Sequence, residues 1–514
     1  MTAMSPPSST VSVARRSLRH FAAGRLLSAI VGIGTLLLLV RALEKGDYGL
    51  YIALLAAFEI LQLAASPGAY AVVFRYLPEL REGSAGRAVA RLVGIVTAYR
   101  LVTISLVAAG VALMADWLAA QVGVPGQGLA IRIYALVLVF EGMARFIDAQ
   151  FESLLLQGMA QVSVLVRNAA KLVALAVISV GGSVEVPLQD WLLVEAVTTG
   201  LGATISCILM MRHLMARRIV ASTEMPPLAF DRVQRFALPT YVSQVVGLGT
   251  GSEMVKLLVS KLVGTSATAS FGFAAALSAT LQRYLPGFLL VGWIRPLLIT
   301  ARKQGQSNAE VVVMAQAVLM LNLLLLAPVV SLLAIAGADV VRIMAGGRLP
   351  GSDSFLYFFV VLLAFQSVRG VVSLLGITLE LGNASLRATA WSVLGLLVGL
   401  SIFPFLGIAG LCGGLMVSEL IWSVVMIRAL REGGMHFVFP LRGAAKLLFS
   451  VAFGVGVVLT ALQLVPNQHT SGLALVGGAL AALLCLASSS WLKPFEPAER
   501  ELISRLLPRR LLFW

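Results

Sequence analysis

Charged side chains are scarce in this sequence. Only 12% of its 514 residues are Asp, Glu, Lys or Arg, while 59% are hydrophobic, and soluble domains carry about a quarter charged residues. The sequence also has only three cysteines and four histidines, with no Cys-x-x-Cys motif and no histidine cluster. We therefore expect no disulfide, no metal site and no resident cofactor. A chain this poor in charge cannot have water as its main solvent.

Long apolar runs fill most of the chain. A hydrocarbon core ~30 Å thick needs about 20 apolar residues in a helix, and such runs recur here between short polar breaks. The runs lack the period-two alternation of a membrane β-barrel strand. We therefore predict an all-α polytopic membrane protein with about 14 transmembrane helices. The expected spans are residues 20–40, 50–73, 92–114, 129–156, 160–180, 190–211, 236–260, 267–294, 310–337, 354–378, 388–404, 406–427, 443–465 and 471–492.

The net charge of +15 is distributed in a way that argues against nucleic-acid binding. The 39 Lys and Arg residues fall mainly in alternate loops. With a cytoplasmic N-terminus, the inner loops and tails hold 24 of them and the outer loops hold five, which agrees with the positive-inside rule. We expect a multi-pass protein of the bacterial inner membrane, surrounded by membrane lipids, with both termini in the cytoplasm.

An internal repeat divides the expected spans. Residues 21–35 (FAAGRLLSAIVGIGT) and 236–250 (FALPTYVSQVVGLGT) are identical at seven of fifteen positions, and shorter matches follow in the same order. The seventh span therefore repeats the first, which indicates two six-helix lobes and two extra C-terminal helices. The expected parts are the cytoplasmic N-tail 1–19, the N-lobe 20–211, the cytoplasmic linker 212–235, the C-lobe 236–430, the last two spans 431–492 and the cytoplasmic tail 493–514.

Four strings at span boundaries carry a family resemblance. They are residues 39–51 (LVRALEKGDYGLY), 68–80 (GAYAVVFRYLPEL), 236–242 (FALPTYV) and 405–415 (FLGIAGLCGGL). In this order they resemble the Wzx-type polysaccharide and O-antigen flippases of the multidrug/oligosaccharidyl-lipid/polysaccharide (MOP) exporter superfamily. The resemblance implies two lobes around a central cavity, alternating access and cationic cavity residues that hold the pyrophosphate of an undecaprenyl-linked oligosaccharide. It also implies work in lipopolysaccharide or exopolysaccharide synthesis, beside a polymerase and glycosyltransferases.

The fourth and fifth spans are rich in charge. Their charges form a predicted ladder of six residues: Glu141, Arg145, Asp148, Glu152, Arg167 and Lys171. Spacings of three and four place the first four on one helix face, with Glu141 and Arg145 as a pair. In an antiparallel hairpin, Glu152 would face Arg167 and Asp148 would face Lys171. The six charges cancel, which favours an internal ion-pair network; a proton or substrate path is the alternative.

Five further cations inside spans are candidate substrate-binding residues: Arg25, Arg283, Arg100, Lys256 and Arg369. Arg25 and Arg283 lie on spans one and eight, which line the central cavity in the family that the chain resembles. The planar guanidinium group can bond two phosphate oxygens and stays charged in a poorly hydrated site. Snorkelling towards the interface is the alternative for Arg25, and pairing with a carboxylate is the alternative for Arg283.

Two acids inside spans are candidate coupling residues for a proton or cation, because burial raises the pKa of a carboxyl group. They are Glu59 on span two and Glu253 on span seven. A pair with Arg100 or Arg25 is the alternative for Glu59. Glu253 lies one turn before Lys256, so a local ion pair is favoured there.

Three functions fit these features. The first is a flippase for a lipid-linked oligosaccharide, and the second is a cation-coupled multidrug or metabolite antiporter of the same superfamily, which usually lacks two extra spans. The third is a membrane polymerase or ligase of lipid-linked sugars. Such enzymes generally carry a long outer loop with catalytic Arg or His, whereas the longest outer loops here have about 15 residues and hold no His. We therefore expect a transporter rather than an enzyme.

Overall fold

The computed structural model describes residues 27–82, 86–154, 156–181, 185–218, 238, 241–289, 307–379, 381–464 and 471–506. Within these ranges every regular element is a helix. The chain forms two compact units. The first holds Met1–Val245 and Leu257–Thr268, and the second holds Val246–Lys256 and Ala269–Trp514.

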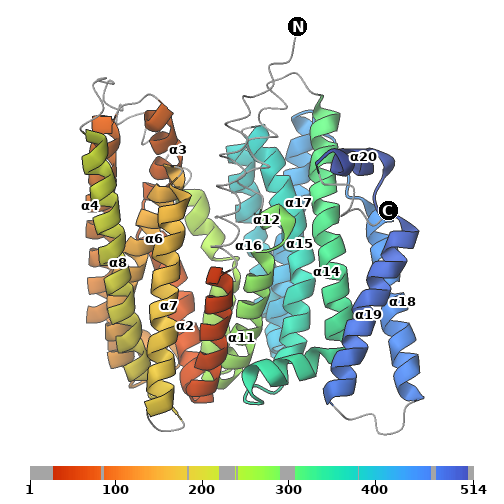
Figure 1. The fold of residues 1–514 in the computed structure, drawn as a ribbon, viewed down its shortest axis with the longest axis horizontal. Helices are drawn as coiled ribbons and strands as arrows, with labels where there is room; N and C mark the ends of the chain where they lie inside the picture. Colours follow the sequence, from red (N-terminus) through yellow and green to blue (C-terminus); the bar gives the residue numbers. More distant parts are fainter. Residues whose placement is uncertain are drawn as a thin grey trace. The chain divides into compact units, whose positions relative to one another are not determined.

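The first unit consists of apolar helices connected by short loops (Figure 1, red to yellow). A helix at Leu27–Ala42 comes first. The helices that follow are α2 (Lys45–Ala64), α3 (Ala69–Glu82), α4 (Gly86–Leu113), α5 (Ala115–Val122), α6 (Gly128–Ser153), α7 (Gln157–Gly181) and α8 (Leu188–Arg218). The break between α2 and α3 contains Gly68, which has a φ of 71°, a backbone conformation that glycine adopts without steric cost.

The second unit contains the long C-terminal helices (Figure 1, green to blue). Two helices, α10 (Ser252–Leu262) and α11 (Thr265–Gln282), contribute residues to both units. The others are α12 (Pro286–Leu289), α14 (Asn308–Ala345), α15 (Ser352–Thr378), α16 (Gly382–Leu406), α17 (Ile408–Glu432), α18 (Leu441–Gln463), α19 (Ser471–Leu492) and α20 (Pro497–Leu506). Ser307 begins α14 with a capping box, in which its hydroxyl accepts from the backbone N–H of Glu310.

Ten helices of the described ranges are long and apolar enough to cross a membrane, so the protein is an all-α polytopic membrane protein. The expected spans one, four, seven and eight are not among these ten. The described part of span one is short, and α6 carries the charges of the predicted ladder. Span seven is interrupted by a turn at 249–251, and α11 ends at Gln282. Each of the fourteen expected spans nevertheless contains helical residues in the part that the structure describes.

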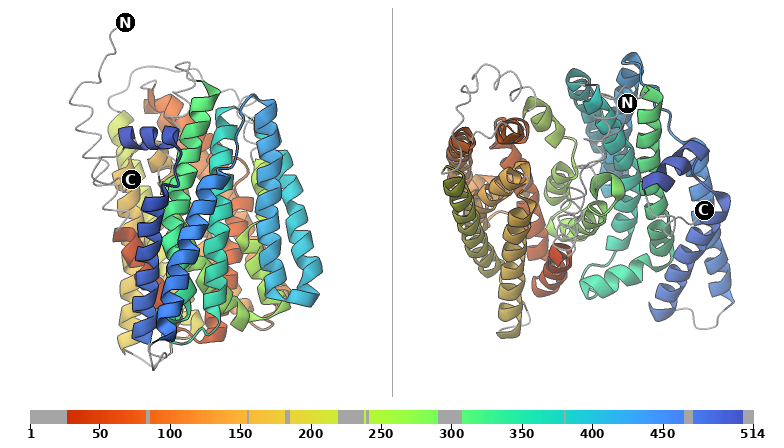
Figure 2. Two further views of the ribbon diagram at one scale, coloured as in Figure 1. Left: turned by 90° about the vertical axis from the view of Figure 1, so that its right-hand side faces the viewer. Right: turned by 45° about the horizontal axis from the view of Figure 1, so that its top comes forward.

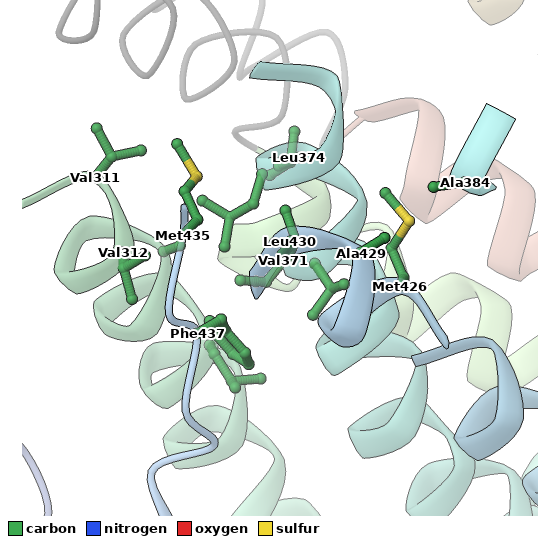
Figure 3. Packing of buried hydrophobic residues seen from close by; sticks show 14 of the residues in the cluster. Val311, Val312, Val371, Leu374, Ala384, Met426, Ala429, Leu430, Met435 and Phe437 are labelled. Atoms are coloured by element: carbon green, nitrogen blue, oxygen red, sulfur yellow. The ribbon is translucent and has the colours of Figure 1, made fainter. Parts of the chain in front are cut away.

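The core of the second unit includes a cluster of side chains between α14, α15, α16 and α17 (Figure 3). Met435 and Phe437, in the segment after α17, are fully buried in it. Figure 3 also labels eight residues that the helices contribute: Val311, Val312, Val371, Leu374, Ala384, Met426, Ala429 and Leu430. The loop after α17 is thereby packed against the bundle.

Glycines allow α16 and α17 to approach each other closely. A Cβ atom added at Gly414 would lie 2.7 Å from the Gly395 carbonyl oxygen and 2.8 Å from the Gly399 Cα atom. The hydroxyl of Ser418 donates across the same interface to the carbonyl oxygen of Ser392 at 2.9 Å. Small residues that bring two backbones together are typical of helix pairs in membranes.

Substitution of Gly414 by alanine should therefore destabilise the protein, by about 1–3 kcal/mol, because the new methyl group overlaps backbone atoms that cannot move away easily. The neighbouring Gly413 is the matched control, because nothing lies within 4 Å of a Cβ atom there. Gly413→Ala should leave stability unchanged or raise it slightly. Thermal unfolding of both variants in detergent tests this. Equal melting temperatures would show that the close approach does not hold the helices together.

Candidate functional site

Charged side chains gather in the interior of the first unit. Four helices contribute them: α2, α6, α7 and α8. We call this set of seven residues the charge network: Glu59, Glu141, Arg145, Asp148, Arg167, Lys171 and Glu195.

Arg145 lies between two carboxylates. Its Nε donates to Glu141 Oε1 at 3.0 Å, and its Nη1 donates to Glu59 Oε1 at 2.7 Å. The guanidinium carbon also lies 4.9 Å from the centre of the Phe58 ring, a cation–π geometry. The expected pair of Glu141 and Arg145 is therefore present, and Glu59 is bound to Arg145 rather than to Arg100.

Arg167 of α7 is held by α6 and by its own helix. Its Nη2 donates to Asp148 Oδ2 at 2.7 Å, and its Nη1 donates to the hydroxyl of Ser163 at 2.9 Å. Glu141 Oε2 lies 3.6 Å from its Nε. A side chain at Gly202 of α8 would overlap the Arg167 stem, so this glycine leaves the space that the arginine fills.

Lys171 connects α7 to α8. Its Nζ donates to Glu195 Oε1 at 3.0 Å and lies 3.8 Å from Glu141 Oε2. The Tyr51 hydroxyl donates to the same Glu195 oxygen at 3.3 Å, and the Tyr51 ring packs edge-on against Trp191 at 6.1 Å. Glu195 is the network residue that was not assigned a role from the sequence. Its position inside an apolar span was the available signal, because a lone carboxylate there needs a partner.

The predicted pairing across the α6–α7 hairpin is wrong. Glu152 was expected to face Arg167, and Asp148 was expected to face Lys171. In the structure Arg167 binds Asp148 and Lys171 binds Glu195, while Glu152 is exposed.

The position of the turn explains the difference. The predicted pairs require the chain to reverse near Ala160, whereas α6 ends at Ser153 and α7 begins at Gln157. Because the turn comes earlier, each residue of α7 faces a residue of α6 that lies about one helical turn closer to the start of α6 than predicted. Hydrophobicity alone did not locate this turn, because residues 153–160 contain both apolar and polar side chains.

The charge network has four carboxylates and three cations, and so carries an excess of one negative charge. It reaches the surface at one end, where the side chains of Glu59 and Arg145 are 42% and 37% exposed. Arg167 and Glu195 are only 4% exposed. Asp148 Oδ1 and Glu195 Oε2 are buried and accept no hydrogen bond from the described residues. The network therefore has carboxylate oxygens with unused capacity to accept a proton.

Arg100 of α4 lies outside this network. Its side chain is fully buried, and none of its three guanidinium nitrogens has a hydrogen-bond partner among the described residues. The Tyr70 ring centre lies 5.9 Å from the guanidinium carbon, and the Tyr70 hydroxyl accepts a hydrogen bond from Gln62 at 3.0 Å. A Cβ atom at Gly142 would overlap Ile104 and would lie 3.5 Å from Arg100 Nη2. Arg100 is thus a buried cation that contacts an aromatic ring instead of an acid.

The second unit carries a smaller charged pair. Arg369 of α15 donates from Nη1 to Glu419 Oε1 of α17 at 3.2 Å, and its guanidinium carbon lies 4.8 Å from the Trp422 ring centre. In the sequence, the separation between Arg145 and Arg369 equals the separation between Glu195 and Glu419. The two units therefore carry an arginine and a glutamate at equal separations along the chain.

The other predicted residues that the structure describes are Glu253, Lys256 and Arg283. Lys256 Nζ donates to Glu253 Oε1 at 2.7 Å, which is the expected local pair. Arg283 follows the last residue of α11 and is exposed. Arg25 lies outside the described residues. Within the described ranges, no three His, Cys, Asp or Glu residues are placed to hold a metal ion.

No protein-family model and no curated protein matches this sequence. Solved structures match its fold. The lipid II flippase MurJ, in an inward closed conformation, gives a TM-score of 0.57 at 14% identity, over 94% of this chain and 99% of that chain. The VcmN MATE transporter of Vibrio cholerae gives 0.55 at 14% identity, over 84% and 100%. An inward-facing MATE family transporter of the MOP superfamily gives 0.51 at 14% identity, over 80% and 94%. This chain shares its fold with these three solved structures.

Proposed function

We propose that the protein is a flippase that moves an undecaprenyl-pyrophosphate-linked oligosaccharide from the inner to the outer leaflet by alternating access, for polysaccharide synthesis and export. A transporter of this kind needs two units that can move against each other and polar groups at membrane depth. Both units have an arginine–carboxylate pair between two helices, Arg145 with Glu59 and Arg369 with Glu419. Such charges inside spans mark substrate or ion pathways.

The extent of the structural match carries this proposal. The match with MurJ covers 94% of this chain. The matches with the two MATE structures cover only 80% and 84% of this chain, although they cover 94% and 100% of the MATE chains themselves. The structural match with the flippase thus covers a larger share of this chain than the matches with the MATE transporters do. This favours a lipid-linked substrate, as does the sequence prediction of two extra C-terminal spans.

The pyrophosphate of the carrier would be bound by arginines. Moving a multiply charged anion through a low-dielectric interior is prohibitive unless cations are already in place. We assign this role to Arg25 and Arg283, with Arg100, Lys256 and Arg369 as further candidates. Arg283 is exposed in the described structure, and its guanidinium group could bond two phosphate oxygens.

A cation-coupled antiporter is the second candidate function. The excess negative charge of the network and the partial exposure of Glu59 favour it, since a proton or cation could enter at that end. Coupling through Glu59 or Glu253 is also compatible with the flippase, so coupling alone does not distinguish the two functions.

Transport by purified protein in liposomes tests the proposal. We expect the protein to move a fluorescent undecaprenyl-pyrophosphate-linked sugar across the bilayer, measured by dithionite quenching, and not to move a fluorescent phosphatidylcholine. Arg283→Ala should lower the rate by at least about tenfold, equivalent to 1.4 kcal/mol in the barrier. Arg283→Lys should restore part of it, because lysine keeps the charge but lacks the bidentate geometry.

Arg387 of α16 is the matched control, since it is also an exposed arginine on an apolar helix. Arg387→Ala should transport at the wild-type rate. Ethidium transport without any movement of the lipid-linked sugar would support the antiporter instead. Full lipid transport by the Arg25→Ala, Arg283→Ala double variant would contradict the site assignment but not the fold.

A further inference from the structure

A group of cations gathers where α19 ends and α20 begins, at the end of the second unit where α18 starts. Figures 1 and 2 both show α20 lying across the bundle rather than along it, close to one end of α14. We call this group the cationic corner. Its members are Arg442, Lys446, Lys493 and Arg500.

Two of these cations converge on one backbone oxygen. Lys446 Nζ donates to the carbonyl oxygen of Lys493 at 3.0 Å, and Arg500 Nη2 donates to the same oxygen at 3.3 Å. Arg500 Nε also donates to the Phe495 carbonyl oxygen at 3.0 Å. The positive charges of α18 and α20 are thus held close together by neutral acceptors.

These contacts use only part of the hydrogen-bonding capacity. An ammonium group has three N–H donors and a guanidinium group has five, while Lys446 uses one here and Arg500 uses two. None of the four cations forms an ion pair with a described residue. Glu499, the buried acid of α20, accepts the backbone N–H of Glu496 at 2.9 Å instead. The remaining donors are available for an anion.

The backbone at this corner is strained. Lys493 has a φ of 49°, and it is the only residue other than glycine with positive φ in the described ranges. Glycine or asparagine would adopt this conformation more easily. Lys493 therefore has a backbone conformation that would be easier for glycine or asparagine. A lysine kept in such a conformation points to a function for its side chain.

The surroundings of the corner match the membrane interface. Trp491, two residues before Lys493, is 81% exposed, and Leu448 and Phe449 on α18 are 71% and 58% exposed. Exposed apolar residues on a membrane helix face acyl chains, and tryptophan is enriched at the level of the headgroups. The cations thus lie at the end of a lipid-facing surface.

We propose that the cationic corner binds the phosphate headgroup of an anionic membrane phospholipid, whose acyl chains lie along α18. A phosphodiester accepts the free donors of Lys446 and Arg500, and the neighbouring charges of Arg442 and Lys493 add to the attraction. Each basic residue near an anionic lipid surface contributes about 1 kcal/mol. This site lies within the second unit and does not depend on the proposed transport function.

Native mass spectrometry of the detergent-purified full chain tests the site, with phosphatidylglycerol and phosphatidylcholine as the probes. Wild type should bind phosphatidylglycerol more tightly than phosphatidylcholine. The triple variant Lys446→Gln, Lys493→Asn, Arg500→Gln should lose that preference by at least about tenfold. Asparagine tolerates the left-handed backbone, so the variant is not expected to lose its fold, which its melting temperature checks.

The matched control removes two exposed cations of α17, in the variant Arg428→Gln, Arg431→Gln, and should keep the wild-type preference. Equal binding of both lipids by wild type, or undiminished binding by the triple variant, would overturn the proposal. Displacement of phosphatidylglycerol by an equal concentration of inorganic pyrophosphate would also overturn it, in favour of a soluble phosphate ligand. A folded Lys446→Arg, Lys493→Arg variant should bind the lipid as wild type does.

Discussion

Substitution of Arg100 by methionine should stabilise the folded protein, by on the order of 2 kcal/mol. The guanidinium group stays charged at any accessible pH, and here it is fully buried with no hydrogen-bond partner among the described residues. Its cation–π contact with Tyr70 offsets only part of the desolvation penalty. Methionine fills similar space with a flexible apolar side chain, so the penalty is removed without a large cavity.

The same variant should transport more slowly under the proposed function, by roughly tenfold or more, because an ionisable residue kept inside a span at such an energetic cost is expected to act in the transport cycle. Thermal unfolding and the liposome assay measure the two effects separately. Arg132→Met is the matched control: its ion pair with Asp116 is largely exposed, so stability should change by less than about 0.5 kcal/mol. A lower melting temperature for Arg100→Met would show that Arg100 is a structural residue.

Substitution of Arg167 by methionine should have the opposite effect and lower stability by about 3–5 kcal/mol. Arg167 is almost as deeply buried as Arg100, with 4% exposure, but it binds Asp148 at 2.7 Å. Its removal leaves the Asp148 carboxylate buried without its main counter-charge. The loss of a partner, rather than the loss of the arginine itself, makes this substitution costly.

The double variant Arg167→Met, Asp148→Leu tests that explanation. With both charges replaced by apolar groups, most of the lost stability should return, because a buried ion pair contributes little net stabilisation over well-packed apolar residues. Denaturant unfolding of the two single variants and the double variant gives the coupling energy directly. If the double variant is as unstable as the sum of the single variants, the two side chains are not energetically coupled.

The contrast between Arg100 and Arg167 indicates which charged residues stabilise the fold and which have a functional role. The charge network is internally paired except for one excess carboxylate, so most of its members hold α2, α6, α7 and α8 together. Glu59 differs from the rest, since its side chain is 42% exposed at the open end. Under the proposed function, Glu59 and Arg100 are therefore the residues of the N-terminal unit that we expect to act in transport.

Properties that depend on one helix could be predicted from the sequence. The ten membrane-crossing helices of the described ranges were predictable because a hydrocarbon core of ~30 Å sets the length of each apolar run. The pairs of Glu141 with Arg145 and of Glu253 with Lys256 were predictable because residues three or four positions apart share a helix face. The break at Pro67 and Gly68, in contrast, was not expected inside span two, because the apolar run continues through it.

Contacts between helices were decided only by the tertiary structure. The partners of Arg167 and Lys171 depend on where the chain turns after α6 and on the approach of α8, neither of which the hydrophobic pattern determines. Arg100 lacks an acid because α3 and α6 place an aromatic ring and a glycine beside it. The cationic corner forms because α20 folds back across the bundle and brings Arg500 to Lys446 (Figure 2). The bilayer thus constrains each helix separately, whereas the environment of every buried charge is determined by packing between helices.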